Sequence, residues 1–159
     1  MRKFLPAVLL FCLCASGAHA ASDFETKTIE ATKPALAVCI AAAYFSDTKH
    51  EGVGMNRAAR VTDAILIAHG LSGALNSRTH GFPSDHATTA FAAASSLSKI
   101  YPKQKYLIYG AACLLGYSIV KTNSHTTGEV LGGAALGMAI GNWSMANKDG
   151  LMLGRSFRF

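Results

Sequence analysis

Cysteine, charged residues and long apolar runs are all scarce in this 159-residue chain. Its four cysteines form no C-x-x-C pair, so the sequence gives no support for a redox-active dithiol. Charged residues make up only 15% of the chain and never form a basic run of five or more, which argues against a nucleic-acid-binding protein. Half of the residues are hydrophobic, which excludes a disordered chain. A compact, apolar domain remains.

The first twenty residues have the pattern of a secretory signal. Arg2 and Lys3 precede the apolar run 4–14, and the small residues Ala18-His19-Ala20 form an A-x-A cleavage site. The apolar run is too short to span a bilayer. We therefore expect residues 1–20 to be removed and the mature protein to be exported to the periplasm or the cell envelope.

Two cysteines, Cys39 and Cys113, follow the expected cleavage site. They would enter an oxidising compartment, where one disulfide can form. Both lie in apolar runs, where a buried thiol is the alternative.

The pattern of apolar residues predicts helices and no convincing strand. Alternation over two residues is confined to the short tail 151–159. We expect an all-α fold, a compact bundle of about five helices. The domains would be a flexible arm (21–32), a helical domain (33–147) and a C-terminal tail (148–159), with a polar connection at 46–56. The expected helices cover residues 35–45, 58–76, 86–100, 106–120 and 130–145.

Two features of the last helices concern packing. The uncharged runs 106–120 and 130–146 are shorter than, or barely near, the roughly 20 residues that cross a bilayer, so spanning is left open. Small residues on or near one face of the fifth helix predict close helix contact. These residues are Gly132, Gly133, Gly137 and Gly141.

The first chemically informative segment is Phe82-Pro83-Ser84-Asp85-His86-Ala87. Ser84 is a good helix N-cap, and Asp85 in the first turn complements the helix dipole. The amides at such a helix start can bind an anion, and His86 would stand beside it as a proton donor. The alternative is a well-capped helix with a surface histidine.

A second histidine, His125, also lies just before an expected helix start. Glu129 is four residues further on, so its carboxylate can reach the imidazole and fix its tautomer. The alternative is a capping box, in which Glu129 serves the backbone of Thr126.

These two segments together resemble the type 2 phosphatidic acid phosphatase and vanadium haloperoxidase superfamily. Its middle motif, P-S-G-H, corresponds to Pro83-Ser84-Asp85-His86, and its last motif, S-R-x5-H-x3-D, corresponds to Ser118-Ile119, His125 and Glu129. The resemblance extends from about Asp47 to Trp143.

The resemblance implies a mechanism and a set of roles. His125 would attack phosphorus to give a phosphohistidine, Glu129 would orient it, and His86 would protonate the leaving oxygen. Ser84 and the backbone amide of Asp85 would hold phosphate oxygens. No metal and no other cofactor would be required.

The chain departs from the family pattern at its basic residues. The first motif, K-x6-R-P, is missing, the arginine of the last motif is Ile119, and the glycine of the middle motif is Asp85. A phosphoryl group needs positive donors around it. Arg78, on the loop that enters the middle motif, is the best candidate to bind the phosphate in their place. The alternative is an exposed loop arginine with no partner. Lys121 would point to nearly the opposite helix face from position 119.

The remaining acidic and histidine residues lack the tight spacing of metal ligands, and positions in solvated loops are the simpler interpretation. They are Asp47, His50, Asp63, His69 and His80.

Two functions from different classes follow. One is an exported phosphatase, independent of metal, that hydrolyses a lipid-linked phosphomonoester or pyrophosphate at a membrane surface or within a membrane. The other is a catalytically silent member of the same fold that binds an anionic headgroup or has a structural role. Vanadate-dependent halide oxidation would need stronger positive potential than this pocket offers.

Overall fold

The structure is a computed structural model that describes residues 29–47 and 51–147. Five α-helices and one short 3-10 helix account for most of these residues, and no strand occurs among them. The all-α prediction is confirmed. The elements are α3 (Thr32–Tyr44), α4 (Glu51–Thr79), α5 (Asp85–Ile100), η1 (Pro102–Gln104), α6 (Lys105–Lys121) and α7 (Thr127–Ala146).

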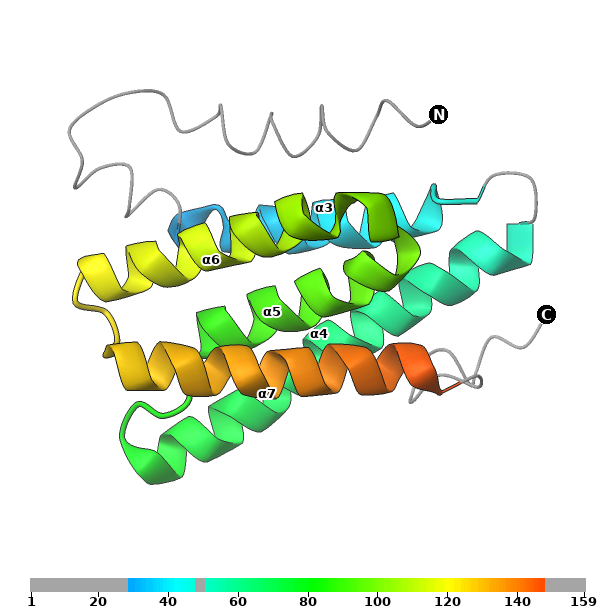
Figure 1. Cartoon of the computed structure of the whole chain (residues 1–159). Helices are drawn as coiled ribbons and strands as arrows, with labels where there is room; N and C mark the ends of the chain where they lie inside the picture. Colours follow the sequence, from blue (N-terminus) through cyan, green and yellow to red (C-terminus); the bar gives the residue numbers. More distant parts are fainter. Residues whose placement is uncertain (1–28, 48–50, 148–159) are drawn as a thin grey trace.

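Helix α5 is the centre of the bundle. It packs against α3, α4, α6 and α7, and its most extensive contact is with α7 (Figure 1). Its buried side chains are mostly small, so neighbouring helices can approach it closely. Buried hydroxyls on α5 donate to carbonyl oxygens, which satisfies them without water: Ser96 Oγ to Ala92 at 2.9 Å and Thr88 Oγ1 to Ser84 at 2.8 Å.

The predicted small-residue face of α7 lies against α5. A Cβ on Gly137 would stand 2.2 Å from the Thr88 carbonyl oxygen, and one on Gly141 would stand 2.5 Å from that of Ala92. Any larger residue would push the two helices apart. These glycines therefore fix the position of α7, including its first turn, against α5.

Helix α4 begins earlier than expected. The sequence predicted a polar connection over 46–56, but the structure is helical from Glu51. Gly54 lies inside this helix and marks no turn. A Cβ there would lie 2.3 Å from the Tyr44 carbonyl oxygen. The glycine instead lets the first turn of α4 pass close to the end of α3.

The N-terminal boundary also differs from the expectation. Residues 29 and 30, inside the expected arm, are helical, and Ile29 packs beside a buried cluster that includes Ile119. The expected signal (1–20), the first part of the arm and the tail (148–159) lie outside the described residues.

Two further observations concern the helices. Within the described ranges, none combines the length and apolar character that a bilayer crossing requires. Half-buried Cys39 on α3 and exposed Cys113 on α6 are not joined in a disulfide.

Candidate functional site

The loop between α4 and α5 carries the middle motif and is shaped by left-handed backbone. His80 has φ 54° and Gly81 has φ 121°, so the chain leaves α4 sharply after Thr79. Gly81 is favoured by its φ, and a Cβ there would stand 3.3 Å from Glu129 Oε1. The loop is therefore built against the start of α7.

Ser84 is the N-cap of α5, as predicted. Its hydroxyl accepts a long hydrogen bond from the Ala87 amide at 3.5 Å, and its carbonyl accepts the Thr88 amide at 2.9 Å. The Ser84 side chain is fully buried. The amides of Asp85 and His86, in the first turn, have no acceptor among the described residues, and they give this helix end its positive potential.

His125 and Glu129 contact each other at the start of α7. Nδ1 of His125 lies 2.8 Å from Glu129 Oε2, which confirms the predicted pairing. Because a carboxylate only accepts, the Nδ1–H donates to it, and in the neutral ring Nε2 then carries the lone pair. The His125 side chain is 18% exposed. An imidazole held in this tautomer has the form that a nucleophile or proton acceptor requires.

The capping box is present as well, so Glu129 has both of the roles that the sequence suggested. Its Oε2 accepts the Thr126 amide at 3.0 Å, while the Glu129 amide donates to Thr126 Oγ1 at 3.4 Å. These contacts lower the pKa of the Glu129 carboxyl, chiefly through the hydrogen bond from His125 and then that from the Thr126 amide. Glu129 is therefore ionised at neutral pH.

The two motifs meet through one backbone hydrogen bond. The Ser84 amide donates to the Glu129 carbonyl oxygen at 3.1 Å. A Cβ on Gly133 would stand 2.7 Å from the Ser84 carbonyl oxygen, so α7 runs directly beside the cap of α5. The helix start that follows His125 is thus joined to the loop that precedes His86, although about forty residues separate the histidines in sequence.

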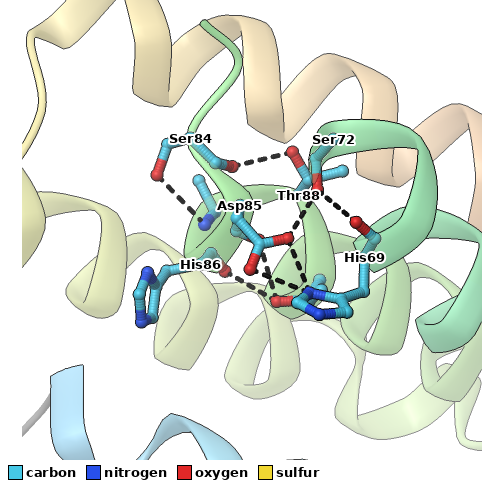
Figure 2. A network of polar contacts seen from close by, with 8 residues as sticks. His69, Ser72, Ser84, Asp85, His86 and Thr88 are labelled. Carbon is cyan, nitrogen blue, oxygen red and sulfur yellow. Dashed lines mark hydrogen bonds and ion pairs between the residues drawn. The ribbon is translucent and has the colours of Figure 1, made fainter. Parts of the chain in front are cut away.

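The Asp85 side chain turns toward α4. Both of its oxygens lie 2.9 Å from His69 Nδ1, and Oδ1 lies 2.5 Å from Ser72 Oγ (Figure 2). Sequence reasoning considered His69 only as a loop residue and did not consider Ser72. They are three residues apart on α4, and that spacing was the available sign that they share a helix face. The solvated-loop interpretation is wrong for His69, which is exposed on a helix, and for Asp63, which is fully buried in α4.

The ring of half-buried His86 lies on the opposite side of Asp85 from His69 in Figure 2. It has no hydrogen-bond partner in the described part of the chain, so its nitrogens are open to a ligand.

The basic residues are placed as follows. Arg78 is exposed, without a hydrogen bond or ion pair to any described residue, and it lies in the last turn of α4 rather than on the expected loop. The Thr79 hydroxyl donates to the Leu75 carbonyl at 2.9 Å, inside the last turn. Ile119, at the position of the family's arginine, is buried among apolar side chains, and Lys121 is exposed.

Within the described ranges, no three His, Cys, Asp or Glu side chains are grouped as a metal site would group them.

Comparison with curated proteins and with solved structures finds no match. The model of one family, described as the PAP2 superfamily, matches residues 5–151. That range covers nearly the whole chain, including both histidine motifs and the helices that bring them together. The chain belongs to the PAP2 superfamily, whose members are generally phosphatases.

Proposed function

We propose that this chain is an exported, metal-independent phosphatase that hydrolyses a lipid-linked phosphomonoester or pyrophosphate through a phosphohistidine at His125. The observation that carries the proposal is the His125–Glu129 pair at the start of α7, joined through Ser84 to the start of α5. Superfamily membership supports phosphatase chemistry in general.

In the first step, His125 Nε2 attacks phosphorus and the bond from phosphorus to the leaving oxygen breaks. His86 donates a proton to that oxygen. Glu129 accepts the Nδ1–H throughout and stabilises the positive charge that the ring acquires. In the second step, water attacks the phosphohistidine, loses its proton to His86, and releases phosphate from a restored His125.

The first-turn amides of α5 and α7 would hold the phosphoryl oxygens. At α5 these are the amides of Asp85 and His86, and at α7 they are those of Thr127 and Gly128. Two positive helix ends beside one phosphoryl group stabilise the charge of its transition state. Ser84 is buried as the cap, so its expected phosphate contact requires the loop to open. Arg78 is the proposed side-chain clamp.

Exposed apolar side chains favour a lipid-linked substrate. Phe82, directly before Pro83, is 46% exposed, and Leu131, two residues after Glu129, is 64% exposed. Apolar surface beside a phosphate site would contact an acyl or isoprenoid chain. Leu131→Ala should then raise KM for a lipid phosphate and leave KM for a small ester unchanged, with Leu107→Ala on α6 as the control.

The direct test is phosphate release by the purified mature protein. Substrates would be a lipid phosphate, a lipid pyrophosphate and a small generic ester, with His125→Ala as the blank and His80→Asn as a control histidine variant. We expect release by the wild type and His80→Asn, and none above background by His125→Ala. Equal release by the wild type and His125→Ala would contradict the proposal.

One observation favours a second candidate, a silent anion-binding member. Ile119 is 1% exposed in an apolar cluster, so the family's last-motif arginine has no counterpart there. Binding of inorganic phosphate without release of phosphate from any ester or anhydride would favour this alternative.

A further inference from the structure

Asp85 occupies the position where the superfamily has glycine, which raises an electrostatic problem for the proposed function. Its own amide and that of His86 are the free donors at the start of α5. A carboxylate rotated toward them would occupy their anion site and repel a phosphoryl group. A phosphatase site can tolerate Asp85 only if its side chain is held elsewhere.

The structure shows what holds this carboxylate. Nδ1 of His69 lies 2.9 Å from both oxygens, and the Ser72 hydroxyl donates to Oδ1 at 2.5 Å. A separation of 2.5 Å is at the short end for a hydroxyl on a carboxylate, as expected of a charge-assisted bond. Ser72 is fully buried and the Asp85 side chain is 28% exposed, so the hydroxyl binds the carboxylate from its buried side.

The direction of the Asp85 side chain leaves the backbone donors clear. In Figure 2 the carboxylate points toward His69 and Ser72 of α4, and the His86 ring lies on the other side of Asp85. His69 also donates its Nδ1–H to the Asp85 carboxylate. The bonds therefore prevent Asp85 from rotating toward the first turn of its own helix.

We propose that His69 and Ser72 are positioning residues that hold the Asp85 carboxylate against α4 and so keep the N-terminus of α5 open to a phosphoryl group. The inference rests on the proposed function. It adds a role for two residues of α4, since a glycine at position 85 would need no such partners.

The test first removes the His69 and Ser72 side chains and then the charge of Asp85. His69→Ala with Ser72→Ala should raise KM about fivefold, because a freed carboxylate near the phosphate costs about 1 kcal/mol. It should change kcat much less, since the repulsion acts on bound substrate and transition state alike. Adding Asp85→Asn should return KM to within about twofold of the wild type. The increase in KM should also shrink at about 0.5 M salt.

A purely structural role for His69 and Ser72 gives a different result. Asp85→Asn would then fail to rescue the double variant, and salt would not change the KM difference. Ser77→Ala with His80→Asn is the matched control, because it removes one hydroxyl from the last turn of α4 and one imidazole from the loop that follows without touching Asp85. Asparagine tolerates the positive φ of His80.

The dissociation constant of inorganic phosphate separates this inference from the proposed function. This constant should rise about fivefold in the double variant and return to near the wild-type value when Asp85→Asn is added, even if no substrate is hydrolysed. An unchanged dissociation constant in the double variant, or one that Asp85→Asn does not recover, would overturn the inference. Absence of phosphate release dependent on His125 would overturn only the proposed function.

Discussion

The Glu129 carboxylate accepts hydrogen bonds from both the His125 ring and the Thr126 amide, and these contacts hold its pKa below the usual range. A carboxyl whose pKa is lower in the folded than in the unfolded protein stabilises the fold above its unfolded pKa, about 4.3 for glutamate. That contribution is lost as the pH falls through the folded pKa.

Glu129→Gln should therefore lower the free energy of unfolding at pH 7, and the difference from the wild type should diminish toward pH 3. Urea unfolding of both proteins across this pH range measures the free energy of unfolding of each. The difference between the two values cancels the contributions of other titrating groups. A difference that stays constant from pH 7 to pH 3 would show that Glu129 has no such role.

Arg78 is the only arginine or lysine proposed to contact the phosphate. Arg78→Ala should reduce turnover at least tenfold, equivalent to about 1.4 kcal/mol of transition-state stabilisation. Stability should fall by less than about 1 kcal/mol, because the side chain is exposed and only complements the end of α4.

Steady-state kinetics and thermal unfolding of Arg78→Ala check both parts, with Lys121→Ala as the control for loss of an exposed cation at a helix end. Unchanged turnover in Arg78→Ala, with activity still dependent on His125, would leave phosphate binding to the helix amides.

At the scale of elements, the contact between α5 and α7 places the two histidine motifs together. Gly137→Ala should destabilise the protein by about 1–3 kcal/mol, because the new Cβ would stand 2.2 Å from the Thr88 carbonyl oxygen. Gly110→Ala is the matched variant on α6, where a Cβ meets nothing within 4 Å. It should be stabilising by about 0.5–1 kcal/mol, the difference in helix propensity. Chemical denaturation of both variants distinguishes them, and equal effects would contradict the packing argument.

Over the whole molecule, sequence periodicity predicted the helices well because each has a long apolar pattern and a recognisable start or end. The caps at Ser84 and Thr126 and the pairing of His125 with Glu129 were also predictable, since these contacts are local in sequence. The start of α4 was not, because Gly54 is explained by its contact with Tyr44 rather than by a turn.

The contacts of Asp85 could not be predicted from the sequence either. Asp85 meets His69 and Ser72 through the packing of α4 on α5, and no local pattern in the sequence specifies which residues of two packed helices will touch.

The expected export also concerns the whole molecule. Expression of the full chain in a bacterial host should yield a mature protein in the periplasm or envelope fraction whose N-terminus is Ala21. N-terminal sequencing after fractionation measures this. An intact Met1 terminus on cytosolic protein would contradict the export proposal.

Rapid quenching with a phosphate-labelled substrate tests whether His125 is the nucleophile. We expect an acid-labile, base-stable phosphoryl group on the peptide that contains His125 in the wild type, and none in His125→Ala. Glu129→Gln should form it more slowly, because the tautomer with a free Nε2 is no longer fixed. Release of phosphate by the wild type without any phosphorylated His125 would contradict the account.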